Sequence, residues 1–243
     1  MLAKIAGAAL VIALLTCGCG GSSGSGSGSA KLRVLDESNG ASQFNVVVDG
    51  ETVSSNNPYP NCLYEVCQTL SAYATVKSGS VSFALETPPG STNIAPSEFQ
   101  KLNLASDTQS TFVLGPTTSF AVNAPYTGYV FLDDDMPAAN AVKIRIANVD
   151  PRAPNVSAFI LPEGTSPSGN PTVSNIALGA ASNYITVPAG SYTVWFLVPA
   201  PSLGLTPSPY TTWGPTTYTT NQNVTVYLVQ VLEISEAVIL ADN

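Results

Sequence analysis

The chain contains no histidine among its 243 residues. Histidine is the side chain that ordinarily changes charge near neutral pH, so its absence excludes His-based general base catalysis. The Ser-His-Asp and Cys-His arrangements of hydrolases and the His-ligated zinc sites are excluded as well. A serine nucleophile would need a lysine partner, and the lysines fall in expected strands or turns. We therefore expect a protein that is not an enzyme and that holds no cofactor.

Charge is scarce too. Charged residues make up 10% of the chain, with 8 Lys and Arg against 16 Asp and Glu. The basic residues are too few and too scattered to neutralise a phosphate backbone. We therefore expect no nucleic-acid partner. Disorder is the alternative explanation for the low charge, but disordered chains lack β-branched and aromatic residues. This chain is rich in Val, Ile, Thr and Tyr, which favour strands.

The first residues have the pattern of an export signal. Lys4 precedes an apolar run over residues 5–15, which is shorter than the roughly 20 residues that span a bilayer. The run leads into Cys17 and Cys19, and Gly18 before Cys19 resembles the lipobox of bacterial lipoproteins. We expect Cys19 to be acylated, with Cys17 as the alternative and an ordinary secretory signal as the other interpretation. The partner would then be the lipid bilayer of the bacterial cell envelope, with the protein facing the periplasm or the cell surface.

Residues 20–29 consist almost entirely of Gly and Ser. Such a composition behaves as a flexible coil that cannot pack into a core. Behind a signal peptide over residues 1–19, it is placed as a tether between the acyl anchor and the folded part.

The rest of the chain contains two copies of one strand pattern, about 110 residues apart. Both copies alternate apolar and polar residues, which is typical of half-buried strands. The aligned segments are AKLRVLD (30–36) with VKIRIAN (142–148), FNVVVDG (44–50) with VSAFILP (156–162), residues 71–85 with 182–196 without a gap, and VFLDDD (130–135) with VILADN (238–243). Because this spacing is that of a whole domain, we place one domain at 30–137 and a second at 138–243.

Neither repeat shows a convincing helical period, and Pro and Gly, of which the whole chain has 19 each, punctuate both. Short alternating strands between such turns predict an all-β fold. We expect two tandem Ig-like or Greek-key antiparallel β-sandwich domains.

The order of these motifs resembles the bacterial family of domains of unknown function called DUF4397. The resemblance is carried by the YxTVxxGS segment at residues 73–80 and by VDPRAPNVSAFI at residues 149–160. The first copy departs from the second motif, with ESNGASQFNVVV at residues 37–48. The resemblance implies a tandem, secreted or lipid-anchored β domain, and it implies no activity.

Cys62 and Cys67 lie in an insertion that only the first copy has. In the oxidising compartment that export implies, a disulfide closing this short loop is the first interpretation, and free thiols are the alternative. Two cysteines without histidine do not make up a zinc site.

Two aromatic, Pro-rich segments could contact a glycan or an envelope protein, since flat rings cover apolar surfaces. The other interpretation is that Trp213 closes the end of the core. The candidate ligand-binding residues are Tyr59, Tyr64, Tyr210, Trp213 and Tyr218.

Asp133, Asp134 and Asp135 form the only acidic run. Oxygen ligands at a domain junction suit Ca²⁺, but no EF-hand spacing is present, so we expect a solvated strand end and no metal.

Together these patterns predict a membrane-anchored β-sandwich lipoprotein that acts as a non-catalytic binding or spacer module. An adhesin-like module that binds carbohydrate or protein through its Tyr and Trp loops is the alternative, and a hydrolase is the least favoured interpretation.

Overall fold

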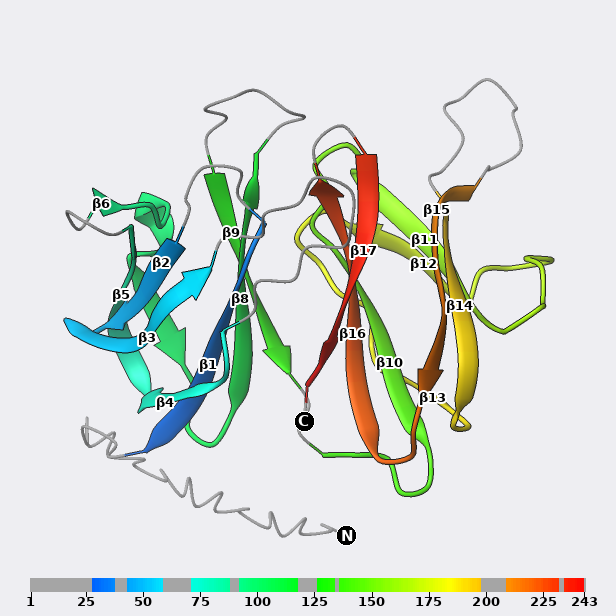
Figure 1. Ribbon diagram of the computed structural model, residues 1–243, viewed down its shortest axis with the longest axis horizontal. Helices are drawn as coiled ribbons and strands as arrows, with labels where there is room; N and C mark the ends of the chain where they lie inside the picture. Colours follow the sequence, from blue (N-terminus) through cyan, green and yellow to red (C-terminus); the bar gives the residue numbers. More distant parts are fainter. Residues whose placement is uncertain are drawn as a thin grey trace, which may run out of the picture.

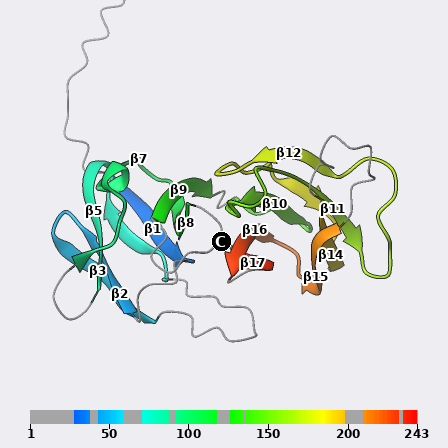
Figure 2. The same cartoon turned by 90° about the horizontal axis from the view of Figure 1, so that it is seen from above.

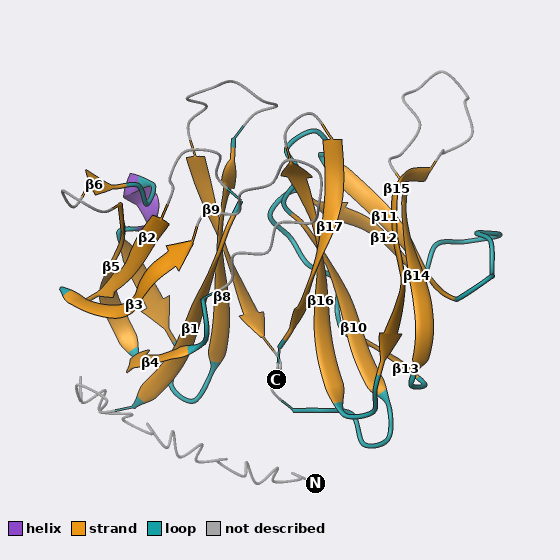
Figure 3. Cartoon of the chain, viewed as in Figure 1, coloured by secondary structure: helices purple, strands orange, loops and turns teal. Residues whose placement is uncertain are grey.

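The structure is a computed structural model that describes residues 28–37, 43–58, 71–87, 92–117, 126–133, 136–197, 209–231 and 234–242. Within these residues the chain forms strands and one short 3-10 turn, η1 (Ser97–Phe99) (Figure 3). No helix in this part of the chain is long and apolar enough to cross a membrane.

The first domain is a sandwich of two sheets. One sheet has the order β4-β1-β8-β9 and the other the order β3-β2-β5-β6, with β7 also paired to β5. The strands are β1 (Ser29–Asp36), β2 (Gln43–Val48), β3 (Glu51–Pro58), β4 (Ala74–Lys77), β5 (Gly79–Thr87), β6 (Thr92–Asn93), β7 (Lys101–Leu104), β8 (Gln109–Pro116) and β9 (Tyr126–Asp133).

The second domain repeats this plan, with sheets in the order β13-β10-β16-β17 and β12-β11-β14-β15. Its strands are β10 (Val142–Asn148), β11 (Asn155–Pro162), β12 (Val173–Ala177), β13 (Ile185–Val187), β14 (Gly190–Leu197), β15 (Pro209–Tyr218), β16 (Gln222–Val231) and β17 (Ile234–Ala241).

The predicted pair of β-sandwiches is confirmed, with one difference in each. The pairs β1–β8 and β10–β16 run parallel, whereas the other strand pairs are antiparallel. The first strand of each domain therefore lies between a parallel and an antiparallel neighbour, so both its edges are hydrogen-bonded.

The repeats are structurally equivalent. Arg33 pairs with Thr111 just as Arg145 pairs with Thr225, and Ser71 and Ser182 each hydrogen-bond the first strand of their own domain. The alignment of the last segment was wrong by one residue. Asp133, rather than Asp134, is the equivalent of Asp242, because Asp133 pairs with Gln109 and Asp242 hydrogen-bonds Asn223. An all-apolar run fits either register in sequence, and only the position of the buried carboxylate distinguishes them.

Each sandwich encloses its own core. In the first domain Phe112 lies at the centre, 4.7 Å from the ring of Phe83 and 5.5 Å from that of Phe99. In the second domain Ile144, Phe196 and Val226 are fully buried between the sheets.

A third apolar cluster joins the two domains. It lies on the outer faces of β1, β8 and β9 in one domain and of β10, β16 and β17 in the other. These faces meet in the middle of the molecule, so the four sheets stack as layers (Figures 1 and 2). Its buried members are Leu35, Val113, Phe131, Ala147, Val149, Tyr227, Val229 and Leu240.

Strands β1, β8, β10 and β16 are therefore covered on both faces. The half-buried alternation predicted for the first strand is wrong, because Arg33 and Arg145 are only 2% and 5% exposed. From sequence alone, an outward polar residue on a strand is predicted to be solvated. The prediction fails here because the second domain covers that face.

Tyr227 tests the packing between the domains. Its ring meets Phe131 edge-on at 5.4 Å, and its hydroxyl is buried without a hydrogen-bond partner among the described residues. Because a buried hydroxyl without a partner costs free energy, we expect Tyr227→Phe to leave the unfolding free energy unchanged or raise it by about 1 kcal/mol. Tyr227→Ala should lower it by about 3 to 5 kcal/mol. Urea unfolding of both variants measures this, and a clear loss in Tyr227→Phe would reveal a partner for the hydroxyl.

Candidate functional site

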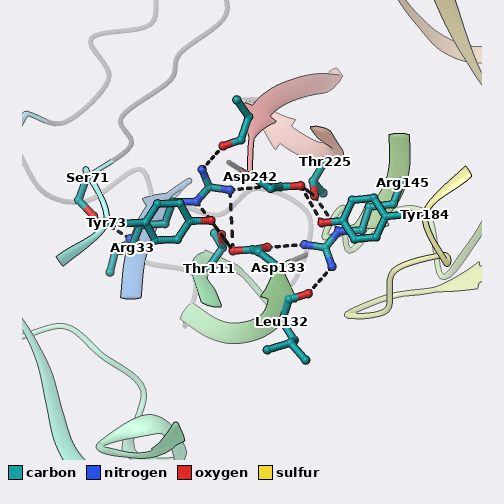
Figure 4. Close-up of polar contacts among 12 residues, drawn as sticks. Arg33, Ser71, Tyr73, Thr111, Leu132, Asp133, Arg145, Tyr184, Thr225 and Asp242 are labelled. Carbon is teal, nitrogen blue, oxygen red and sulfur yellow. Dashed lines mark hydrogen bonds and ion pairs between the residues drawn. The ribbon is translucent and has the colours of Figure 1, made fainter. Parts of the chain in front are cut away.

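The most unusual chemistry in the described chain is a buried group of charges between the domains (Figure 4). We call it the interdomain cluster. It takes four equivalent residues from each repeat: Arg33, Tyr73, Thr111 and Asp133 from the first domain, and Arg145, Tyr184, Thr225 and Asp242 from the second.

Arg33 reaches from its own domain into the other. Its Nε donates to Thr111 Oγ1 of the neighbouring strand at 2.7 Å. Its Nη2 donates to Asp242 Oδ1 at 2.6 Å, and its Nη1 donates to the carbonyl of Ala241 at 2.5 Å. One guanidinium thus holds its own sheet with one nitrogen and the other domain with two.

Arg145 makes the same contacts in the opposite direction. Its Nε donates to Thr225 Oγ1 at 2.7 Å, and its Nη1 donates to the carbonyl of Leu132 at 2.6 Å. Its Nη2 is hydrogen-bonded and ion-paired to Asp133 Oδ1. Each arginine therefore pairs with the aspartate of the other domain.

Tyrosine and threonine hydroxyls saturate the carboxylates from within each domain. Asp133 Oδ2 accepts hydrogen bonds from Tyr73 at 2.7 Å and Thr111 at 2.6 Å. The equivalent oxygen of Asp242 accepts them from Tyr184 at 2.8 Å and Thr225 at 2.6 Å. A carboxylate that is taken out of water needs such donors on both oxygens.

The tyrosine rings also cover the arginines. The guanidinium carbon of Arg33 lies 4.4 Å from the ring centre of Tyr73, and that of Arg145 lies 4.7 Å from the ring centre of Tyr184. A cation over an aromatic face is attracted by the ring's quadrupole, more strongly where water is excluded. Each tyrosine therefore contacts the arginine and the aspartate of its own domain.

Strand register brings these residues together. Arg33 lies opposite Thr111 in the parallel pair β1–β8, and Asp133 ends β9 opposite Gln109, two residues before Thr111. Alternation along the strands then places all three side chains on the outer face of the sheet, which the second domain covers.

The electrostatics follow from burial and from the two like charges. Burial and the nearby Asp133 raise the pKa of Asp242 above its ordinary 3.8, although Thr225, Arg145 and Arg33 oppose the shift. Burial also raises the pKa of Tyr73, as does Asp133. For Arg145, burial lowers the pKa, but Tyr227, Tyr184 and the aspartates outweigh it and raise it overall. The cluster contains two arginines and two aspartates, so their formal charges balance.

Asp133 is not the solvated strand end that was expected. It is 5% exposed, and its carboxylate oxygens accept hydrogen bonds from Arg145, Tyr73 and Thr111. No group of potential metal ligands occurs among the described residues. Asp134 and Asp135 lie outside them.

The aromatic candidates have mixed placements. Tyr218 was expected at a ligand surface, but it is buried at 4% exposure, 6.4 Å from the ring of Tyr192, and burial raises its pKa to about 12. Trp213 is half-buried and packs against the core of the second domain. Tyr210 begins β15, and its side chain is outside the described part, as are Tyr59, Tyr64 and the cysteines Cys17, Cys19, Cys62 and Cys67.

The sequence carried a signal for this site that residue-by-residue reasoning missed. The repeat alignment matched Arg33 with Arg145 and Tyr73 with Tyr184. In a chain with only 8 basic residues, the same arginine in the same strand of both copies indicates a shared partner. The partner itself was hidden by the one-residue error in the last segment.

Removal of one charge should cost more than removal of a pair. Arg33→Met leaves Asp242 without its cation, so we expect the unfolding free energy to fall by about 3 to 5 kcal/mol. In Arg33→Met/Asp242→Leu most of that loss should be recovered, because no uncompensated charge remains. Arg152→Met is the matched control, since Arg152 pairs with Asp150 inside one domain and is partly exposed. A loss in the double variant equal to the sum of the losses in Arg33→Met and Asp242→Leu would show that the two residues do not interact.

The pKa of Asp242 also fixes a pH dependence. A carboxyl whose pKa is higher in the folded state stabilises the fold fully below its ordinary pKa of 3.8, and this contribution is lost as pH rises through the folded pKa. We therefore expect the unfolding free energy of the wild type, relative to Asp242→Asn, to decline as the pH rises above 3.8. Denaturant titrations at several pH values measure the difference, and a rise instead would contradict the expectation.

Comparison with known protein families finds one match. The sequence profile of the family described as Domain of unknown function (DUF4397) matches residues 30–159, from β1 to the first half of β11. No curated protein sequence matches the chain.

Two solved structures are distant likenesses. A leucine-rich repeat protein from Bacteroides thetaiotaomicron is 13% identical with a TM-score of 0.22, over 86% of this chain and 27% of its own. A product complex of the multi-modular glycogen-degrading pneumococcal virulence factor SpuA is 9% identical with a TM-score of 0.26, over 87% of this chain and 21% of its own. The chain thus spans about a quarter of these proteins, and neither likeness carries an argument about function.

The family match covers more than half of the chain and includes both Arg33 and Arg145. The chain therefore belongs to the DUF4397 family.

Proposed function

We propose that this protein is a non-catalytic lipoprotein of the bacterial cell envelope, in which acylated Cys19 holds a stiff two-domain spacer on the bilayer. The observation that carries the proposal is the reciprocal exchange of ion pairs, in which each arginine binds the other domain's aspartate.

Stiffness follows from the cost of opening this interface. Hinged domains usually meet through exposed polar surfaces that water can reoccupy on either side. Here the side chains of Arg33, Arg145, Asp133 and Asp242 are each at most 6% exposed. Separating the domains would break both cross-domain pairs at once and also expose the apolar cluster around Tyr227 and Phe131.

The same geometry argues against catalysis at the cluster. A general acid or base must reach the proton that it transfers in a bound substrate. The carboxylate oxygens of Asp133 and Asp242 face internal donors, and the cluster is enclosed between two sheets. These contacts support a structural role for its charges.

The adhesin-like alternative has less support. It needs aromatic side chains on the surface, whereas Tyr218 is buried and Trp213 packs partly on the core. Trp195 on β14 is also half-buried.

Lipid anchoring is tested by replacing one cysteine at a time. In cells, Cys19→Ser should remove the acyl mass from the protein and release it from the membrane fraction. Cys17→Ser is the matched control and should stay acylated. Mass spectrometry of the extracted proteins and flotation of membranes measure both effects. Acylation that survives in Cys19→Ser and is lost in Cys17→Ser would move the anchor, and acylation in neither wild type nor control would end the proposal.

Stiffness is tested in the exported form that lacks both anchor cysteines, Cys17→Ser/Cys19→Ser. Small-angle X-ray scattering of this form should fit one fixed arrangement of the domains. Adding Arg33→Ala and Arg145→Ala should broaden the distance distribution and raise the radius of gyration, because the cross-domain contacts are gone. Adding Arg152→Ala instead should change neither. A broad distribution before any arginine is removed would contradict the spacer.

A further inference from the structure

We propose that a small apolar patch on β9 and the residue shortly after it rests against the lipid surface and orients the anchored protein. The patch consists of Val130, Leu132 and Met136. The proposal rests on the lipid anchoring proposed above and adds which face of the protein meets the bilayer.

These three residues stand out by their exposure. Val130 is 43% exposed, Leu132 61% and Met136 71%, and they are the large hydrophobic side chains exposed in the described part of the chain. All three lie within seven residues of sequence. Single exposed apolar residues are ordinary, but a group of them without others elsewhere marks a contact surface.

The equivalent positions of the second domain expose less apolar surface. Register makes Ile239 the equivalent of Val130 and Ala241 the equivalent of Leu132. Ile239 packs against the core, where β15 contacts β17. Ala241 is exposed but offers only a methyl group. The first domain thus has a leucine at the position where the second domain has an alanine.

The fold of the first domain explains why the patch is uncovered. Where the second domain has the ten-residue strand β15, the first has η1 and the short strands β6 and β7. The ring of Phe99 in η1 lies over Gly128, where a Cβ would come within 2.9 Å of it. That cover ends before Val130, and Figure 4 shows the Leu132 side chain pointing away from the interdomain cluster.

The patch lies at the end of the molecule where the Gly/Ser tether joins. Lys31, near the start of β1, pairs with Gln109, and Gln109 pairs with Asp133 at the end of β9. The start of β1 and the end of β9 are therefore at the same end of the sheet, as Figure 1 shows. An anchor at Cys19 would hold this end toward the bilayer.

Exposed positive charge gathers at the same end. Lys31 and Lys77 are exposed and flank the start of β1. Lys143, the second residue of β10, is partly buried and donates from Nζ to the carbonyl of Met136 at 2.6 Å. Lysines beside apolar side chains suit the interface of an anionic bilayer. Asp107 and Glu163 also lie near this end, and Asp134 and Asp135 stand between Leu132 and Met136 in the sequence. We therefore assign the contact to the apolar side chains, with Lys31 and Lys77 directed at lipid phosphates.

The test places a fluorescent reporter in the patch of the full acylated chain. Leu132→Trp is reconstituted into vesicles of phosphatidylcholine and phosphatidylglycerol, with and without bromine on the acyl chains. Bromine quenches only tryptophans that reach the lipid. Asn155→Trp is the matched control, at an exposed position where β11 begins at the opposite end of the second domain. The wild type gives the background from Trp195 and Trp213.

We expect brominated lipid to reduce the added emission of Leu132→Trp and shift it to shorter wavelength, and to leave that of Asn155→Trp unchanged. Adding Val130→Ser and Met136→Ser to Leu132→Trp should weaken the quenching, which shows that the patch and not the new ring makes the contact. All variants should float with the vesicles, because flotation reports the acyl anchor.

Two results would overturn the inference. Flotation without quenching of Leu132→Trp would remove the patch from the bilayer and leave the anchor intact. A concentration-dependent dimer with that same result would assign the patch to a second copy of the chain. Loss of flotation in every variant would overturn the anchoring and, with it, the contact.

Discussion

Two guanidinium groups that each cross from one domain to the other determine how this protein is put together. A buried ion pair gains little over well-packed apolar side chains, because removing the charges from water consumes most of their attraction. The ion pair matters because a buried charge is strongly destabilising when its partner is absent. Arg33 without Asp242 would keep only a 3.9 Å contact with Asp133, and Arg145 without Asp133 would lose the carboxylate that it is hydrogen-bonded to. The docked arrangement of the domains is thereby strongly favoured over arrangements that shift the two faces even slightly.

The cluster has the logic of a symmetric dimer within one chain. In an isologous interface, residue i of one subunit contacts residue j of the other, and j contacts i in return. Arg33 with Asp242 and Arg145 with Asp133 repeat that relation between the two halves of a single polypeptide. Duplication also explains why Thr111 and Thr225, or Tyr73 and Tyr184, play identical parts. A single mutational change in an ancestral repeat would have appeared on both sides of such an interface.

Sequence reasoning predicted the fold well and the site poorly, for one physical reason. Turn residues, alternation and the repeat are local signals, and they gave the two β-sandwiches and the equivalence of Tyr73 and Tyr184. The burial of Arg33 depends on a surface that arrives from the other domain, and an alternating strand with an outward arginine is the same in sequence whether that face meets water or protein. The one-residue error at Asp133 followed likewise from an apolar run with no polar mark to fix its register.

The contact between Arg33 and Asp242 joins residues 209 positions apart. Contacts between such distant residues close late, because the intervening chain must be ordered first. A polypeptide that is synthesised from its N-terminus would therefore present Arg33 and Asp133 to solvent for the whole interval in which the second repeat is still being made. During that interval the first repeat displays one half of a self-complementary surface, and two such nascent chains side by side could exchange partners. A high concentration of such chains would then favour domain-swapped pairs. The short linker between β9 and β10 counteracts this by raising the local concentration of the correct partner.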